Sequence, residues 1–282
     1  MRISELSDNQ LNEKIRKNEE IAKLVKPYEN YKGADEVVTA QIIKEQVETS
    51  TEQKKLYTSM NRLNNTLDGF KLGDLVTVSG ISGNGKTELL ISLTKDFIDR
   101  NYQVLWVSYE VSPKDFMSRF GEYEPMFYLP KQNVPNSVEW LLKRIYEAKA
   151  KYNIEVVIID HLHFLLDMQT LKHQNISHIF GGIIRRIKST CLMLDITCFL
   201  VAHLNKTQTK DVPDLVDFRD SSFTYQEADT VLIIHRETSG TEIDLKQTKF
   251  EALLRIAKNR WNGYLGIIKL TYDKQKRRYY SD

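Results

Sequence analysis

The sequence predicts an α/β fold in which a mostly parallel, twisted sheet carries helices on both faces and follows a short helical N-terminal arm. From about residue 66 onward, short β-branched runs alternate with helical patterns. These runs are apolar throughout, which is typical of parallel strands covered on both faces. Before residue 60 the chain is instead rich in charge and nearly free of glycine.

The N-terminal arm, residues 1–60, contains two amphipathic stripes that predict helices. The first runs from Leu11 to Val25 and ends before Pro27, and the second runs from Val38 to Val47. Both stripes are too polar to form a core of their own. We therefore expect the arm to pack on the main domain, residues 61–282, or on a neighbouring subunit.

Within the main domain, the alternation of patterns predicts the individual elements. Strands are predicted at 75–78, 103–108, 155–160, 197–201, 230–235, 253–258 and 266–272. Helices are predicted at 87–99, 138–152 and 176–194. The first four strands alternate with helices and indicate a parallel sheet, whereas the last three follow one another and predict hairpins.

Composition excludes some classes of protein. Hydrophobic residues make up 41% and charged residues 28%, as in a globular protein with a substantial core. No apolar run reaches about 18 residues and the N-terminus is polar, so we expect no membrane span, no secretion signal and a cytosolic location. The two cysteines, Cys191 and Cys198, are expected to be core thiols.

Net charge is only +2, but basic residues outnumber acidic ones from Arg255 to the end of the chain. This basic stretch favours partners that carry phosphate. A solvated strand edge has the same composition, so the stretch decides nothing by itself.

The segment Gly80–Thr87 fits the phosphate-loop pattern G-x-x-x-x-G-K-[ST], between a predicted strand and a predicted helix. Its glycines permit the positive φ angles that point amide N–H groups inward, and the helix adds its positive dipole end. Lys86 is expected to reach the β- and γ-phosphates of ATP, and the Thr87 hydroxyl to bind Mg²⁺. The other loop residues expected to contact the nucleotide are Gly80, Ser82, Gly83, Asn84 and Gly85.

Two carboxylates follow predicted strands at the edge where ligands bind in open α/β sheets. Asp160 ends the strand 155–160 and suits a Mg²⁺ ligand, although a turn aspartate can also end a strand. Glu110 follows the strand 103–108. It can face the γ-phosphate and polarise water, or it can belong to the N-cap region of a helix starting near Ser112.

Four histidines, at positions 161, 163, 173 and 178, lie close together in the sequence. Their spacing matches no familiar zinc pattern, so we expect no metal site from this group. Lys206 and Lys210 lie in a polar loop after the strand 197–201, where they either contact nucleic-acid phosphates or are simply solvated.

Six segments resemble the RecA-like motor domain of DnaB-type replicative DNA helicases, over about residues 62–275, and follow one another in the same order as in that family. Ser108–Ser112 is similar to the family's S-L-E-M-S segment, and Ala257–Gly263 to its K-x-R-x-G hairpin. The others are the lead-in at 64–74, the Walker B strand at 158–162, the sensor strand at 200–206 and the DNA-contacting segment at 217–229.

The resemblance implies roles in ATP hydrolysis for several residues. Glu110 is implied as the general base, with Asp160 at Mg²⁺ and His203 as the γ-phosphate sensor. Arg260 is implied as an arginine finger that acts, with Lys258 beside it, on the ATP of a neighbouring subunit. Glu227 is also expected to contact the nucleotide.

The resemblance also implies a hexameric ring that moves 5′→3′ on single-stranded DNA at a replication fork, with primase and a helicase loader as partners. Arg219, Asp220 and Ser222 are implied to line the central channel. Ser222 replaces a family glycine, and His203 replaces the usual bacterial glutamine, as in phage helicase-primases. We expect a phage-like variant without the family's usual N-terminal domain, in which residues 1–60 supply at most a linker helix.

Two other functions fit parts of the pattern. A RecA/RadA- or KaiC-like ATPase forms filaments or rings without unwinding, although the hairpin at 257–263 argues for a helicase. An accessory protein can instead use ATP only as an assembly switch, which the short N-terminal region leaves open.

Overall fold

The computed structural model describes residues 8–49, 54–120, 126–132, 134, 137–161, 165, 176–203, 222–236 and 249–281. The chain divides into two compact units, Met1–Glu52 and Gln53–Asp282. The sequence placed this boundary near residue 60. Leu56 and Met60 are fully buried in the core of the second unit, which therefore begins earlier than the composition suggests.

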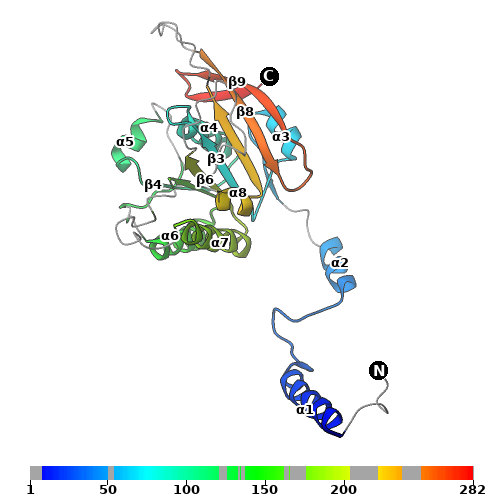
Figure 1. The fold of residues 1–282 in the computed structure, drawn as a ribbon. Helices are drawn as coiled ribbons and strands as arrows, with labels where there is room; N and C mark the ends of the chain where they lie inside the picture. Colours follow the sequence, from blue (N-terminus) through cyan, green and yellow to red (C-terminus); the bar gives the residue numbers. More distant parts are fainter. Residues whose placement is uncertain are drawn as a thin grey trace. The chain divides into compact units, whose positions relative to one another are not determined.

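The first unit consists of α1 (Asp8–Val25), the short 3₁₀ turn η2 (Lys26–Tyr28) and α2 (Ala40–Thr49) (Figure 1). Both predicted helices are present. Pro27 stands in η2, directly after α1, because its ring and missing N–H are incompatible with a continuing helix. Within its own unit α2 buries no side chain.

An eight-stranded sheet in the order β10-β9-β8-β7-β3-β6-β5-β4 forms the centre of the second unit (Figure 1). The five strands from β7 to β4 are parallel, and β8, β9 and β10 are added as antiparallel hairpins. The strands are β3 (Leu75–Gly80), β4 (Val104–Ser108), β5 (Val156–Asp160), β6 (Thr197–His203), β7 (Thr230–His235), β8 (Lys249–Asn259), β9 (Gly266–Asp273) and β10 (Arg278–Ser281).

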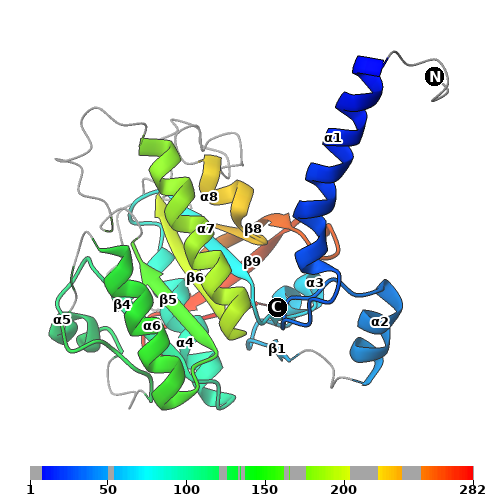
Figure 2. The same cartoon turned by 90° about the horizontal axis from the view of Figure 1, so that it is seen from below.

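Helices cover both faces of this sheet, as the apolar strands predicted. Figure 2 shows α6 and α7 side by side across one face, with α4 behind the sheet. The helices are α3 (Asn61–Leu67), α4 (Lys86–Asp99), α5 (Pro113–Ser118), α6 (Val138–Tyr152), α7 (Ile176–Leu194) and α8 (Ser222–Glu227). Among the helices described, none is long and apolar enough to cross a bilayer.

Alternating side chains along each strand build two separate cores. On β3, Leu75 joins the core formed with α6 and α7, whereas Val76 and Val78 join the core formed with α3, α4 and α5. This division follows from the two-residue period of a strand. Because β3, β4, β5 and β6 are parallel, their carboxyl ends lie along one edge, where the site described below is found.

Some elements lack a sequence signal. The two-residue strands β1 (Lys55–Leu56) and β2 (Phe70–Lys71) pair with each other, and the short elements α3, α8 and β10 were not predicted either. Each is too short for its apolar residues to show a period. Strand β8 is longer than predicted because its pairing with β9 extends to Lys249.

Candidate active site

The phosphate-loop segment lies between β3 and α4, as its pattern predicts. Gly83 and Gly85 have φ angles of +82° and +92°, in the left-handed region that favours glycine. Helix α4 begins at Lys86, so its first free N–H groups face the loop. This arrangement is an anion site of the kind that binds phosphate groups.

Lys86 is nearly buried in this loop, with 5% of the residue exposed. Its Nζ donates hydrogen bonds to the carbonyl oxygens of Gly80 (3.0 Å) and Ile81 (3.2 Å). Burial lowers the pKa of Lys86, and the charges of Asp160 and Glu110 oppose this shift. The ammonium group can therefore exchange carbonyl oxygens for the oxygens of a bound phosphate.

Asp160 and Thr87 come together from the end of β5 and the start of α4. The Thr87 hydroxyl donates to Oδ2 of Asp160 over 3.2 Å, and Asp160 is only 1% exposed. A buried carboxylate beside a hydroxyl oxygen supplies the hard oxygen ligands that Mg²⁺ prefers. These two residues thus fit a magnesium ion at the phosphate loop.

Glu110 follows β4, whose last residue, Ser108, pairs with Asp160 in the sheet. The N-cap of α5 is Ser112, whose hydroxyl accepts from the Asp115 N–H, so Glu110 does not cap that helix. The Glu110 side chain is 46% exposed, and its Oε2 lies 3.5 Å from Nδ1 of His161. Its exposed part can face a ligand at the loop.

His161 was not assigned to this site from the sequence. It is buried, and its Nδ1 also lies 2.9 Å from Oδ1 of Asp160. Glu110, Asp160 and His161 offer ligand atoms that all lie within 4.8 Å of one another. The ends of β4 and β5 thus create a compact acidic group with one imidazole between the two carboxylates.

A pocket of about 230 Å³ joins the phosphate loop to this acidic group. Its lining consists of loop and helix residues, the acidic group and two arginines: Ser82, Gly83, Gly85, Lys86, Thr87, Glu88, Glu110, His161, Arg119 and Arg236. Arg236 directly follows β7 at the same edge of the sheet, and its guanidinium lies 5.1 Å from the Phe250 ring centroid. The pocket therefore combines the carboxylates of Glu88 and Glu110 with cations suited to phosphate groups.

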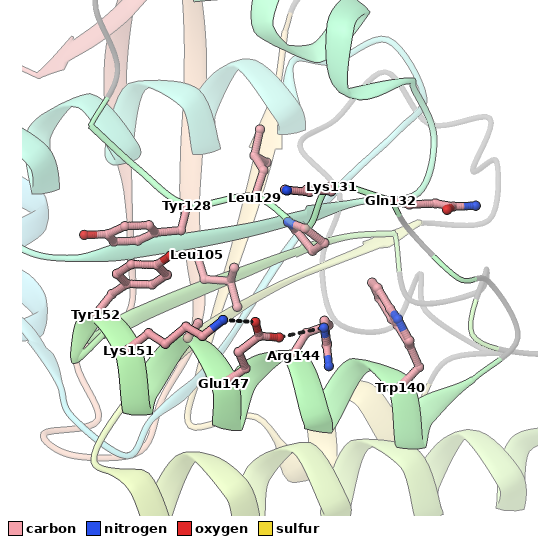
Figure 3. A pocket seen from close by; sticks show the side chains of 12 residues that line it. Leu105, Tyr128, Leu129, Lys131, Gln132, Trp140, Arg144, Glu147, Lys151 and Tyr152 are labelled. Carbon is pink, nitrogen blue, oxygen red and sulfur yellow. Dashed lines mark hydrogen bonds and ion pairs between the residues drawn. The ribbon is translucent and has the colours of Figure 1, made fainter.

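A larger hollow, of about 530 Å³, lies between α6 and the segment 126–132 beside β4 (Figure 3). Its lining residues differ from those of the phosphate-loop pocket. Among the described residues that line it, the one acid is Glu147, which is paired with Lys151 (2.5 Å) and Arg144 (2.6 Å). Tyr128 and Tyr152 stack with ring centroids 4.0 Å apart. Since phosphate-loop residues and Glu110 line the smaller pocket, we place the candidate site there.

Residues 122–281, more than half of the chain, match the family model described as the DnaB-like helicase C terminal domain. The chain belongs to this family. A probable replicative DNA helicase of Trieres chinensis is 24% identical over 248 residues, which cover 75% of this chain and 54% of that protein. The chain spans about half the length of the curated relatives it matches.

Two solved structures show the same fold as this DnaB-like domain. One is an ATPase domain that superposes with a TM-score of 0.69, covering 85% of this chain and 95% of that one at 18% identity. A DnaB-like replicative helicase studied with its primase interactions superposes with a TM-score of 0.68, covering 93% and 71% at 18% identity. These likenesses confirm the predicted RecA-like architecture.

Three predicted residues of the DnaB-like domain lie at the opposite edge of the sheet. Strand β8 runs antiparallel to β7, so Asn259 pairs with Thr230 at the start of β7. Arg260 and Lys258 therefore lie beside the amino end of β3, far from its phosphate loop. Glu227 precedes β7 at this same edge and pairs with Arg185 (3.0 Å), so it is not in the phosphate pocket of its own chain.

The remaining predicted residues of the DnaB-like domain are only partly described. His203 ends β6 and pairs in register with Gly80, which puts its backbone next to the phosphate loop. Ser222 is the first residue of α8. Lys206, Lys210, Arg219 and Asp220 lie outside the described residues, so their contact with DNA stays a prediction.

Gly85→Ala is expected to destabilise the DnaB-like domain more than Gly83→Ala does. Both substitutions strain a left-handed backbone, at about 1–2 kcal/mol each. Only at Gly85 does the new Cβ meet a neighbour, the buried Tyr279 hydroxyl at 2.6 Å, whereas the Cβ at Gly83 meets nothing within 4 Å. Overpacking should add about 1–3 kcal/mol, measured by urea unfolding.

Tyr279→Phe identifies the clashing atom. In the Tyr279→Phe background, Gly85→Ala should cost no more than Gly83→Ala, because the hydroxyl oxygen is gone. An unchanged penalty in that background would show that the clash is not the cause.

Asp74→Asn is expected to change how stability depends on pH. Burial, followed by the charge of Asp229, raises the pKa of Asp74 from 3.8 to about 6, although the Trp261 indole N–H donates to its carboxylate (3.0 Å). Because the folded state holds this proton more tightly, stability is lost as pH rises through about 4–6. Ionisation of Asp74 should cost about 3 kcal/mol once complete.

The free energies of unfolding of the wild type and Asp74→Asn, measured from about pH 4 to about pH 8, check this prediction. The variant cannot ionise at this position, so it should gain about 2–3 kcal/mol on the wild type across the range. A difference that does not vary with pH would mean that Asp74 titrates normally.

Proposed function

We propose that this chain is the motor of an ATP-dependent replicative DNA helicase, which forms a ring and moves along single-stranded DNA to unwind duplex. One observation carries the proposal: the residues predicted to take part in hydrolysis lie at two opposite edges of the same sheet. The phosphate loop, Asp160 and Glu110 lie at the carboxyl edge. Arg260 lies at the amino edge.

Arg260 is too far along the sheet to serve its own phosphate loop. Its backbone N–H donates to the carbonyl of Asp229 (2.9 Å), whose own N–H donates to the carbonyl of Leu75 at the start of β3. The loop begins at Gly80, at the other end of this strand, roughly 17 Å away at about 3.3 Å per residue. A head-to-tail ring would place Arg260 of one subunit at the loop of the next.

In such a composite site, each residue has a distinct task. The loop N–H groups and Lys86 bind the phosphates, and Glu110 accepts a proton from the attacking water. Thr87 and Asp160 would hold Mg²⁺, which neutralises phosphate charge when bound. Arg260 from the neighbour stabilises the charge that develops on the transferred phosphoryl group, and hydrolysis therefore depends on assembly.

Movement on DNA requires that the phosphate state reach the DNA-binding segment. His203 lies beside Gly80 and directly precedes the segment that contains Lys206, Lys210, Arg219, Asp220 and Ser222. Loss of the γ-phosphate can then shift this segment and its grip on DNA through His203. Normal coupling between hydrolysis and DNA binding in His203→Ala would contradict this part of the proposal.

The function is tested by ATP hydrolysis with and without single-stranded DNA, together with unwinding of forked duplexes. A helicase motor should show DNA-stimulated turnover and should unwind a fork with a 5′ tail in preference to one with a 3′ tail. DNA-stimulated turnover without unwinding would indicate a RecA-like ATPase. Little turnover under either condition would indicate an assembly switch.

A further inference from the structure

A buried carboxylate, Asp229, lies between α8 and β7 and contacts the side chain of Arg260. The distance from Nη1 of Arg260 to Oδ1 of Asp229 is 3.0 Å. Asp229 is 1% exposed, whereas the Arg260 side chain is 61% exposed. The guanidinium is thus attached at one point to a fixed carboxylate while most of its surface faces outward.

The other carboxylate oxygen of Asp229 is held from two directions. Oδ2 accepts from the Leu75 N–H (2.9 Å) and from Nζ of Lys188 (2.5 Å). Lys188 also donates to the carbonyl of Gly73 (2.8 Å). These bonds fix Asp229 to the start of β3, the strand whose other end carries the phosphate loop.

The charge balance indicates that the contact with Asp229 orients the Arg260 side chain and is not needed to neutralise the carboxylate. Lys188 already compensates the negative charge of Asp229, so folding does not need a second cation beside this carboxylate. Arg260 is nevertheless bonded to Oδ1. A guanidinium has five N–H donors in a planar fork, so one of them can stay on Asp229 while others bind phosphate oxygens.

The backbone around Arg260 is fixed on both sides. Its own N–H donates to the Asp229 carbonyl. On one side Lys258 donates to the Tyr225 carbonyl (2.7 Å), and on the other the indole of Trp261 donates to Asp74, with Nζ of Lys71 3.8 Å from the Trp261 ring centroid. The remaining freedom is that of the Arg260 side chain, and Asp229 restricts it.

We propose that Asp229 is a positioning residue that aims Arg260 at the ATP of the neighbouring subunit. This inference rests on the proposed composite site and names the residue that prepares its second half. A group held in place before the reaction costs less to order at the transition state, and a displacement of about 1 Å can lower the rate about 100-fold.

The test is Asp229→Asn. Asparagine keeps an oxygen for the Leu75 N–H and Lys188, but it puts an amide group where Arg260 needs an acceptor. ATP affinity should stay unchanged while turnover falls about 10–100-fold. Glu139→Gln removes an exposed ion pair with Arg186 on another part of the domain and should leave turnover unchanged.

Mixing experiments separate positioning from damage to the variant's own pocket. Lys86→Ala subunits carry an intact Arg260 but a defective phosphate loop. They are mixed in equal amounts with Asp229→Asn subunits before nucleotide is added, so that the rings assemble at random. In about a quarter of the sites, the intact loop of an Asp229→Asn subunit should then face the intact Arg260 of a Lys86→Ala subunit. Turnover should therefore exceed the sum of the separate proteins, as it should for Arg260→Ala mixed with Lys86→Ala.

Each outcome decides a different point. If Arg260→Ala is rescued and Asp229→Asn is not, or if Asp229→Asn turns over normally, Asp229 is not a positioning residue. If Arg260→Ala itself is not rescued, the proposed composite site is contradicted, and so is this inference, which rests on it. Should Asp229→Asn unfold early in a melting experiment, Asp229→Glu keeps the charge beside Lys188 but displaces the carboxylate, and the same mixing pattern is expected.

Discussion

Lys86→Ala is expected to lower ATP turnover by at least about 10²–10³-fold. The Lys86 ammonium lies in the phosphate loop on the carbonyl oxygens of Gly80 and Ile81. We expect this buried charge to lie beside the phosphates when ATP binds. Loss of its charge-assisted hydrogen bonds should also weaken ATP binding by about 1.5–3 kcal/mol, measured by titration with a fluorescent nucleotide.

The same substitution should not unfold the domain. Burial lowers the pKa of Lys86, so the charged side chain costs stability in the folded state and its removal should leave the melting temperature equal or higher. Lys95→Met is the matched control, because Lys95 is also buried on α4 and donates to the Lys276 carbonyl (2.9 Å), away from the pocket. Lys86→Ala with wild-type turnover would show that this loop is not the hydrolytic site.

Glu110→Gln is expected to retain ATP binding and to lower turnover by about 10²–10⁴-fold. The amide keeps the size of the side chain and can still interact with His161, but it cannot accept the proton of the attacking water. Steady-state turnover and nucleotide titration on the same preparation separate the two effects.

Asp115→Asn is a suitable control for Glu110→Gln. Asp115 is an exposed carboxylate in the first turn of α5 that accepts from the Ser112 hydroxyl (2.6 Å). Its loss should leave turnover unchanged. Near-normal turnover in Glu110→Gln would remove Glu110 from the role of general base and leave His161 or another group to orient the water.

Much of the fold follows from local pattern. The strands at 75–78, 155–160 and 197–201 are continuous apolar runs because both of their faces are buried, and this is why their starts were predicted to within one residue. The strands β3 and β6 run two residues further than predicted. The phosphate loop could be predicted equally well from the sequence, since the glycines with positive φ and the lysine lie within one short segment.

The pocket as a whole was harder to predict from the sequence, since it is assembled from segments that lie far apart in the chain. Arg236, His161 and Tyr279 approach the loop only because β7, β5 and β10 end or pass there in the folded sheet. A charged residue directly after a strand at this edge, such as Arg236, was a usable signal that was missed. The contact of Arg260 with Asp229 depends on the register of β7 with β8, which no sequence period encodes.

The measurement that tests the composite site most directly is ATP turnover per subunit across a dilution series, with native mass determined on the same samples in the presence of Mg²⁺ and single-stranded DNA. Turnover per subunit should fall in step with dissociation of the oligomer, because a lone subunit lacks Arg260 at its own phosphate loop. A lone subunit that hydrolyses ATP at the full rate would contradict it.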